Sequence, residues 1–383
     1  MSVFFYFCDM KYFIIAGEPS GDLHGSKLMQ GIAHEDSNAQ FCFCGGDRMV
    51  EVGGVQSLVK HYKEMSFFGF MQVLKNLKTI FTQIDECKRS IEQFNPDVII
   101  LIDYPSFNMR IAKWAHKKGI KVYYYIAPKV WAWKEWRVKS IRKYVDRVYT
   151  IFPFETEYFK GKGIQTTFCG NPLVDDIDQM RSKLPSREQF ITQNNLDSRP
   201  IVALLAGSRI SEIRDNLPDM VAMAKQFPDY QFIVTAVAWI DKSIYNSYLC
   251  GSEVKYLCNQ TQQTLAHSEA AVVTSGTATL ETALMGIPEM VVYHVPKLYE
   301  ILRPYVLKIP FISLVNINLN REAVREMVCA NLNIDHAATE LRSILKGGSK
   351  REKMLQDFAE LSALIGGCGS SQRFATEIVK TLK

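Results

Sequence analysis

Short apolar runs alternate with amphipathic stretches along most of the chain. Apolar runs bounded by turn residues are typical of parallel strands that are buried on both faces. Such runs lie at 12–16, 39–43, 98–102, 121–126 and 148–151, and again at 201–205, 231–235 and 270–273. Helical periodicity lies between them, at about 23–33, at 109–118, from 215 onward, and at about 349–382 with an interruption at Gly366-Gly367-Cys368-Gly369.

This alternation predicts an α/β fold made of two Rossmann-like, doubly wound domains that face a cleft. A length of 383 residues suits two domains. We expect an extension at 1–9, a first domain at 10–172, a second at 173–348, and C-terminal helices at 349–383.

Composition narrows the class of protein. Hydrophobic residues make up 47% and charged residues 22%, an ordinary globular balance. The nine cysteines show no C-x-x-C spacing and no accompanying histidine pattern, which argues against a zinc module and against a disulfide framework. The apolar start of the chain lacks a basic residue and is stopped by Asp9, and no stretch is long enough to predict a membrane span. A soluble or peripheral cytoplasmic protein is expected.

Two segments combine aromatic and basic residues. Residues 110–147 hold twelve Lys or Arg against two acidic residues, with Trp131 and Trp133 among their four tryptophans. A solvated helix face with core tryptophans explains this, and so does a surface for anionic, amphipathic material; nucleic acid fits the charge, but no nucleic-acid module is recognisable. Segment 61–77 crowds apolar residues between lysines and suits either a buried helix or a membrane and acyl-chain contact through Phe67, Phe68, Phe70 and Met71.

Two polar loops follow strands of the first half. Gly17-Glu18-Pro19-Ser20-Gly21-Asp22 lies between a strand and a helix, where open α/β sheets bind ligands, although a tight turn with an Asp helix cap explains it equally. Asp103-Tyr104-Pro105-Ser106-Phe107-Asn108 follows the strand 98–102. A carboxylate at a buried strand end is poorly solvated, so we expect a raised pKa for Asp103 and a usable general base, with Asn108 capping the next helix.

Two loops of the second half suit a diphosphate. In Ala206-Gly207-Ser208-Arg209 the small residues admit a phosphate and Arg209 supplies a charged fork. The segment Thr274-Ser275-Gly276-Thr277-Ala278-Thr279-Leu280-Glu281 runs from a strand into a helix, so its amides form an anion site, and Glu281 is able to accept from ribose hydroxyls. A Ser/Thr helix cap with an acidic first turn is the alternative.

In this order, these motifs resemble those of the lipid-A-disaccharide synthase family from about residue 10 to about residue 327. Further matching stretches are Ile126-Ala127-Pro128-Lys129-Val130-Trp131-Ala132-Trp133, Pro153-Phe154-Glu155 and Gly170-Asn171-Pro172-Leu173-Val174-Asp175. The resemblance implies an inverting GT-B glycosyltransferase that needs no metal or other cofactor. It implies UDP-2,3-diacylglucosamine as donor, 2,3-diacylglucosamine 1-phosphate as acceptor, and the lipid A disaccharide as product.

The resemblance also implies site roles. Asp103 is the expected base, and the expected acceptor-binding residues are Glu18, Ser20, Asp22 and Asn108. The expected UDP-sugar contacts are Gly207, Ser208, Arg209, Ser275, Gly276, Thr277, Ala278, Glu281, Asn316 and Glu326. Peripheral association with the cytoplasmic surface of the inner membrane, and a homodimer with exchanged C-terminal helices, are implied in the same way.

The chain departs from the family pattern at three places. Pro19 stands where Ala is expected, Asn320-Arg321-Glu322 replaces a Gly-Arg-Glu step, and Cys329 replaces a Gln. The last two weaken the nucleotide contacts expected in 316–329. A UDP-sugar epimerase, a polyprenyl-dependent sugar transferase and a non-catalytic lipid-binding module are the competing hypotheses. The basic, Trp-rich segment argues against the first, Glu18-Pro19-Ser20 against the second, and the two diphosphate loops against the third.

Overall fold

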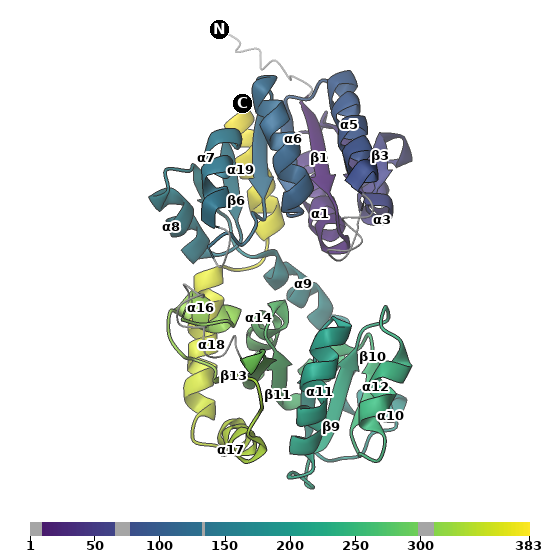
Figure 1. Ribbon diagram of the computed structural model, residues 1–383, viewed down its shortest axis with the longest axis vertical. Coiled ribbons are helices and arrows are strands. Elements are labelled where there is room, and N and C mark those ends of the chain that lie inside the picture. Colours follow the sequence, from purple (N-terminus) through teal and green to yellow (C-terminus); the bar gives the residue numbers. More distant parts are fainter. Residues whose placement is uncertain (1–9, 66–76, 132–134, 298–309) are drawn as a thin grey trace. The chain divides into compact units, whose positions relative to one another are not determined.

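The structure is a computed structural model that describes residues 10–65, 77–131, 135–297 and 310–383 (Figure 1). The chain forms two compact units. Unit 1 comprises Met1–Asp175 together with Ile365–Lys383, and unit 2 comprises Asp176–Leu364. The C-terminal segment therefore returns to the unit in which the chain begins.

Unit 1 is built on a seven-stranded parallel sheet with the order β3-β2-β1-β4-β5-β6-β7. Its strands are β1 (Lys11–Ala16), β2 (Gln40–Gly45), β3 (Leu58–His61), β4 (Val98–Ile102), β5 (Lys121–Tyr125), β6 (Arg147–Thr150) and β7 (Thr166–Phe168). Its helices are α1 (Pro19–Glu35), α2 (Asp47–Gly53), α3 (Tyr62–Met65), α5 (Leu77–Phe94), α6 (Pro105–Lys117), α7 (Val138–Tyr144), α8 (Pro153–Gly161) and α19 (Ser370–Leu382), and α9 (Pro172–Arg181) leads into unit 2.

Both faces of this sheet are buried, because successive residues of a strand point to opposite sides. Tyr12 and Ile14 of β1 pack in the cluster that includes residues of α1 and α19. Phe13 and Ile15 pack in the cluster on the other face, with residues of α5 and α6. The central strands therefore read as continuous apolar runs in the sequence.

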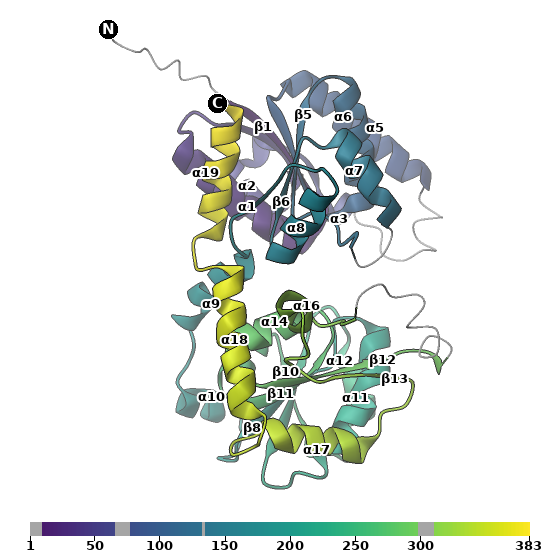
Figure 2. The ribbon, with the colours of Figure 1, turned by 90° about the vertical axis from the view of Figure 1, so that its left-hand side faces the viewer.

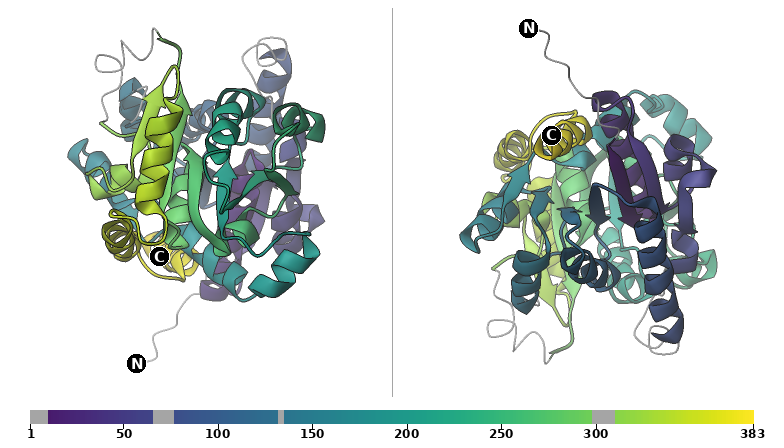
Figure 3. Two further views of the ribbon diagram at one scale, coloured as in Figure 1. Left: turned by 90° about the horizontal axis from the view of Figure 1, so that it is seen from below. Right: turned by 90° about the horizontal axis from the view of Figure 1, so that it is seen from above.

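Helix α19 lies beside α1 (Figures 2 and 3). A Cβ added at Gly31 of α1 would come within 2.7 Å of the Cβ of Ala375, so glycine permits the close approach of these helices. Phe374 is fully buried against Tyr125, at 4.9 Å between ring centroids. The carboxylate of Asp175 accepts hydrogen bonds from the amides of Gly369 at 2.5 Å and Ser371 at 3.3 Å, and so caps α19.

Unit 2 contains a six-stranded parallel sheet with the order β10-β9-β8-β11-β12-β13. Its strands are β8 (Ile201–Leu205), β9 (Gln231–Ala236), β10 (Lys255–Cys258), β11 (Ser268–Thr274), β12 (Glu289–His294) and β13 (Glu326–Cys329). Its helices are α10 (Arg187–Gln193), α11 (Ile210–Ala224), α12 (Lys242–Leu249), α13 (Thr261–Ala266), α14 (Thr277–Leu284), α16 (Leu314–Leu319), α17 (Ile334–Ile344) and α18 (Arg351–Ile365).

In both sheets the strand order reverses beside the first strand, between β1 and β4 and between β8 and β11. Such switch points are the usual ligand-binding positions of open α/β sheets. The prediction of two doubly wound parallel sheets is confirmed, and strands β4 and β8 have the predicted bounds.

Three predicted helix starts are wrong. Helix α1 begins at Pro19 rather than near Leu23, so Asp22 lies inside α1 and does not cap it. Helix α6 begins at Pro105 rather than near Met109, because proline is favoured in the first turn of a helix. Asn108 therefore lies inside α6 and does not cap it. Helix α11 begins at Ile210 rather than near Asp215, and the Glu212 carboxylate in its first turn accepts from the backbone amide of Arg209, the residue before the helix.

Candidate functional site

The polar residues of unit 1 gather where its central strands end. Asp103 follows β4, Lys129 follows β5, and Glu155 follows β6 in the first turn of α8. Strands β4, β5 and β6 are consecutive in the sheet and parallel, so their carboxyl ends lie at one edge. Glu18 follows the neighbouring β1 at the same edge.

The backbone at Asp103 is held in an unusual conformation. Asp103 and Tyr104 have φ values of 41° and 47°, in the left-handed region that non-glycine residues rarely adopt. The carbonyl oxygen of Asp103 accepts hydrogen bonds from the Tyr124 hydroxyl at 2.6 Å and from the Asn108 amide at 2.7 Å. These two bonds offset the cost of the strained turn and fix the direction in which the Asp103 side chain leaves the backbone.

The electrostatic setting of Asp103 suits a proton acceptor. Burial raises the pKa of the Asp103 carboxyl above its usual value, while the charge of Lys129 acts to lower this pKa. A half-buried carboxylate with a raised pKa beside a cation is suited to act as a general base. The raised pKa agrees with the expectation drawn from the buried strand.

Tyr104 closes the turn against the first loop. A Cβ at Gly17 would overlap the Tyr104 ring, so only glycine fits at this contact. The Tyr104 ring stacks on Phe107 at 5.5 Å, and its hydroxyl donates to the carbonyl oxygen of Met65 at 2.8 Å. The Gly17 motif and the Asp103 motif are therefore in direct contact.

The four expected acceptor residues have different surroundings. Glu18 is half-buried and its charge acts on Tyr104, and Ser20 is exposed in the first turn of α1. Asp22 is 3% exposed, and its carboxylate accepts from the amides of Gly46 at 2.7 Å and Met49 at 3.1 Å. Asn108 is fully buried and donates to the carbonyl oxygens of Ile102 and Asp103. Asp22 and Asn108 therefore form hydrogen bonds that hold the loops, whereas the side chains of Glu18 and Ser20 are accessible to solvent.

A buried carboxyl lies beside Trp131. Glu155 is 2% exposed, and its Oε1 accepts a hydrogen bond from the Trp131 indole at 3.0 Å. Burial raises the pKa of Glu155 to about 7, against the opposing effects of the Trp131 hydrogen bond and the Lys129 charge. Lys129 therefore influences both Glu155 and Asp103.

In unit 2 the loop after β8 is organised by an acidic residue. Gly207 has φ 114°, and a Cβ there would come within 2.5 Å of the Glu212 side chain. The Glu212 carboxylate accepts from the amides of Ser208 at 2.9 Å and Arg209 at 3.3 Å, and from the Arg209 guanidinium at 3.0 Å. The loop thus directs two amides and one cation at an anion, which here is a carboxylate of the chain itself.

The loop after β11 opens a helix. Helix α14 begins at Thr277, after Gly276, which is exposed and provides no side-chain cap. The first amides of such a helix have no intrahelical acceptor and are suited to bind an anion. The Ser275 hydroxyl donates to the carbonyl oxygen of Ile312 at 2.9 Å, while the half-buried Ala278 lies in the first turn. Strands β8 and β11 are adjacent, so both loops lie at one edge.

Glu281 lies one turn into α14. Its Oε1 accepts a hydrogen bond from the Gln262 amide of α13 at 2.8 Å, and burial raises its pKa above the usual value. The side chain is half-buried, which is compatible with a hydrogen bond to a sugar hydroxyl. Gln262 is a neighbour that the sequence did not reveal, because it comes from a different helix.

Asn316 and Glu326 are engaged within unit 2. Asn316 is fully buried; its amide donates to the Val324 carbonyl at 2.8 Å and to Glu326 at 2.9 Å, and its oxygen accepts from the Ala323 amide at 2.8 Å. Glu326 also accepts from the amides of Ile312 and Ser313. These two side chains therefore hold the segment to which Ser275 is bonded, rather than presenting free polar groups to a nucleotide.

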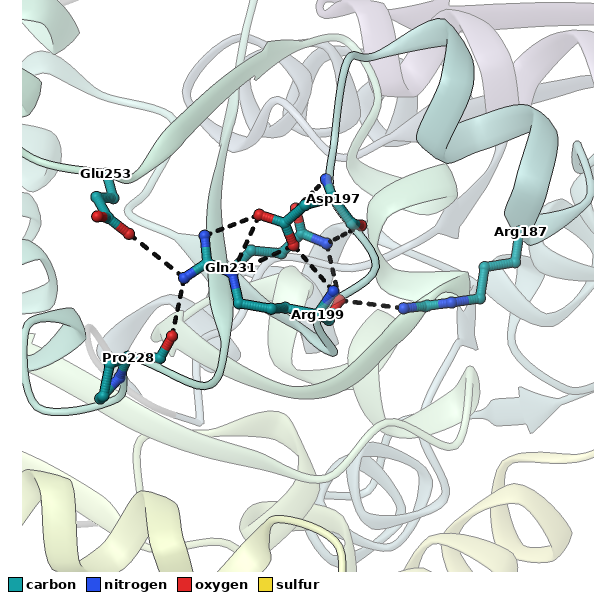
Figure 4. A network of polar contacts seen from close by, with 6 residues as sticks. All are labelled: Arg187, Asp197, Arg199, Pro228, Gln231 and Glu253. Carbon is teal, nitrogen blue, oxygen red and sulfur yellow. Dashed lines mark hydrogen bonds and ion pairs between the residues drawn. The ribbon is translucent and has the colours of Figure 1, made fainter.

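The described part of unit 2 also has a pocket at the amino end of β9, opposite the carboxyl edge of the sheet, with a volume of about 310 Å³. Arg199, Gln231 and Glu253 line it. The Arg199 guanidinium is occupied by Asp197 at 2.8 Å and by the Pro228 carbonyl at 2.9 Å, and Gln231 donates to the Asp197 carbonyl (Figure 4). This network ties loops together, and it lies away from the carboxyl edge.

The aromatic residues Phe67, Phe68, Phe70, Met71 and Trp133 lie outside the described residues. Trp131 is half-buried, with its ring edge-on to Phe154 at 4.8 Å. Among the helices that the structure describes, none is both long and apolar enough to cross a bilayer.

The sequence analysis assigned no role to four residues that organise these sites. Tyr124 lies in an apolar strand, and Lys129 and Glu155 stood in the sequence only as parts of the stretches that match the family, without a role of their own. Glu212 left little signal, because the residue three positions before it is Arg209, whose guanidinium cannot accept a hydrogen bond as the Ser or Thr of a capping box does.

Comparisons with known proteins agree with this architecture. The profile of the lipid-A-disaccharide synthetase family matches residues 12–376. The lipid-A-disaccharide synthase of Myxococcus xanthus is 33% identical over 378 residues, covering 97% of each chain. Among solved structures, a putative UDP-N-acetylglucosamine 2-epimerase from Listeria monocytogenes superposes with a TM-score of 0.67 at 13% identity, over 98% of this chain and 97% of that one. Sucrose-phosphate synthase from Thermosynechococcus elongatus superposes with a TM-score of 0.62 at 13% identity, over 97% and 99%.

The structural matches show a GT-B type fold, and the sequence matches show the family. The chain therefore belongs to the lipid-A-disaccharide synthase family, glycosyltransferases that take a UDP-sugar donor and a phosphorylated sugar acceptor and form the lipid A disaccharide.

Proposed function

We propose that this chain condenses UDP-2,3-diacylglucosamine with 2,3-diacylglucosamine 1-phosphate, with inversion at the anomeric carbon, to give the β-1,6-linked disaccharide 1-phosphate and UDP. The observation that carries the proposal is the state of Asp103. Its carboxyl is half-buried with a raised pKa, and its backbone is held by Tyr124 and Asn108. A carboxylate oriented in this way is suited to accept the proton of a sugar hydroxyl.

In the proposed step Asp103 takes the proton from the 6-hydroxyl of the acceptor. The oxygen forms a bond to the anomeric carbon of the donor while the bond from that carbon to the diphosphate oxygen breaks, and UDP leaves with the electron pair. The anomeric centre passes through an oxocarbenium-like state, as in glycoside hydrolysis. Lys129 favours the ionised form of Asp103, and the accessible Glu18 and Ser20 are the candidates for binding the acceptor.

The departing UDP gathers negative charge, which the donor loops are suited to stabilise. The first amides of α14 and the Arg209 guanidinium are the groups assigned to the diphosphate, and Glu281 is assigned to the ribose. Arg209 is 78% exposed and paired with Glu212, so a diphosphate can approach it from solvent. Asn316 and Glu326 are assigned an indirect role, through the segment that they hold.

The test is an assay of the detergent-solubilised protein with both proposed substrates, in which mass spectrometry follows the disaccharide. We expect disaccharide from the wild type and from Asp47→Asn, a control in which an exposed carboxylate is changed. We expect Asp103→Asn to fold and to turn over about 10²- to 10⁴-fold more slowly. A normal rate for Asp103→Asn would remove this residue from the chemistry, and no disaccharide from a UDP-binding wild type would point to another acceptor.

We further propose that the protein works on the cytoplasmic surface of the inner membrane, where amphipathic substrates of this kind reside. Trp136 supports this: its side chain is 66% exposed within the basic segment, and the Arg137 guanidinium lies 5.5 Å from its ring centroid. Tryptophan and arginine together suit the boundary between headgroups and acyl chains. Replacing Phe67, Phe68 and Phe70 with serine should release the protein from anionic vesicles, and unchanged co-sedimentation would contradict the assignment of those residues.

A further inference from the structure

Trp239 is a large aromatic residue exposed at the carboxyl edge of unit 2. It lies in the loop between β9 and α12, and 73% of its surface is exposed. Its indole N–H donates to the carbonyl oxygen of Ser208 at 3.2 Å. The polar end of the ring is therefore tethered while most of its apolar surface remains open to solvent, where a ligand can pack against it.

The loop that carries Trp239 is held at several points. The Ala238 amide donates to the Asn259 side chain at 3.1 Å, the Val237 amide donates to the Tyr245 hydroxyl at 3.4 Å, and Asp241 caps α12 through the Ser243 amide at 2.7 Å. These bonds fix the loop to α12 and to Asn259, the residue that follows β10. A ring on such a loop is already ordered, so little conformational entropy is lost when a ligand packs against it.

The position of Trp239 relative to the donor loops indicates which part of a ligand it would meet. Strand β9 pairs with β8, whose loop holds Ser208 and Arg209. In dinucleotide-binding folds the phosphate lies at the turn after the first strand, and the nucleoside extends toward the end of the second. Strands β8 and β9 are the first and second strands of this sheet. An aromatic ring after β9 is therefore one strand away from the diphosphate, on the side to which a nucleoside extends.

We propose that Trp239 stacks on the nucleobase of the UDP-sugar donor. This inference rests on the proposed function, because it takes a uridine nucleotide as the ligand. The hydrogen bond to Ser208 couples the stacking ring to the loop that receives the diphosphate, so the base and the phosphates are positioned by one connected element. Since every base has a π face, this contact contributes affinity and leaves the choice of uracil to other groups.

The test is calorimetric titration of UDP into the full-length protein and its Trp239→Ala and Trp239→Phe variants. The alanine variant should bind UDP about 5- to 150-fold more weakly, the range observed when a stacking aromatic residue is removed. The phenylalanine variant has an aromatic face but no N–H, so it should retain most of the affinity. Val55→Ala, which truncates an exposed apolar residue of unit 1, is the matched control and should bind as the wild type does.

Three outcomes would overturn the inference. Equal losses in the alanine and phenylalanine variants would mean that Trp239 acts through its bond to Ser208. Unchanged UDP affinity together with weaker binding of UDP-2,3-diacylglucosamine would assign the ring to an acyl chain. Unchanged affinity for both ligands would leave Trp239 without a role in the donor site. A folded wild type that does not bind UDP would instead contradict the proposed function itself, before any variant is compared.

Discussion

At the scale of single residues, two carboxyls at one edge of unit 1 differ in their surroundings. Asp103 is half-buried, and it is the group assigned to proton transfer. Glu155 is almost fully buried, and the Trp131 indole is the side-chain donor that reaches its Oε1 in the described part of the chain. The same burial that suits Asp103 to accept a proton makes ionised Glu155 a cost to the folded state.

The raised pKa of Glu155 predicts a pH-dependent loss of stability. Its pKa is about 7 in the folded protein, against a usual value of 4.5. Between these values the folded protein keeps a proton that the unfolded chain has released, so the free energy of unfolding falls as pH rises through this window. Glu155→Gln can still accept from Trp131 but does not titrate. Its free energy of unfolding relative to wild type should therefore rise by about 2–3 kcal/mol from pH 5 to pH 8.

Urea unfolding at the two pH values measures this double difference. Glu157→Gln, which changes the exposed carboxylate two residues along α8, is the control and should parallel the wild type. Parallel curves for Glu155→Gln as well would mean that Glu155 ionises as easily in the folded protein as in the unfolded chain.

At the scale of elements, the loops at the sheet edges are held by hydrogen bonds from side chains in helices. Each of these side chains bonds to the start of a helix or to the end of a strand. Asp22 lies in α1 and caps α2, and Asn108 lies in α6 and bonds to the end of β4. Glu212 lies in α11 and gathers the amides of its own preceding loop. Several polar residues that the sequence suggests as ligand contacts therefore form hydrogen bonds that hold the loops in place.

Asp22→Ala should destabilise unit 1. The carboxylate accepts from the amides of Gly46, Arg48 and Met49, and without it the start of α2 loses all three bonds. We expect the free energy of unfolding to fall by about 2 kcal/mol, with a smaller loss for Asp22→Asn, which keeps one acceptor oxygen. Thermal unfolding measures the effect. Glu51→Ala, which changes an exposed carboxylate of α2, is the control and should unfold as the wild type does. Unchanged stability with weakened acceptor binding would restore Asp22 to the list of substrate contacts.

At the scale of the whole molecule, the chain leaves unit 1 near Asp175 and returns at Ile365. Asp175 is also the residue that caps α19, so the exit and the return are joined by hydrogen bonds within unit 1. The fold of unit 1 thus needs residues at both ends of the sequence. Unit 2, by contrast, is formed from one continuous stretch.

Phe374→Ala should therefore destabilise unit 1 although it lies close to the C-terminus. Phe374 is fully buried between Tyr125 and Tyr149, with ring centroids at 4.9 and 6.2 Å. Removing a buried phenyl ring costs about 3–5 kcal/mol. Denaturant unfolding measures this loss, and Lys380→Ala on the exposed face of α19 should leave the stability unchanged. If copies of the chain exchange α19, Phe374→Ala should also lower the fraction of dimer measured by sedimentation. Wild-type stability of Phe374→Ala would mean that α19 contributes little to the stability of unit 1.

The sequence by itself determined the alternation of strands and helices, the two parallel sheets, and the loops at their carboxyl ends, because these follow from local apolar periodicity and turn residues. It also identified Asp103, because an aspartate that directly follows a buried strand can be recognised from the order of residues alone. The left-handed turn at Asp103 and Tyr104 was decided by Tyr124 and Asn108, and the engagement of Asn316 by Val324 and Glu326. Hydrogen bonds between distant residues leave no periodic signal, so only the tertiary structure could separate the side chains that hold the loops from those left free for a ligand.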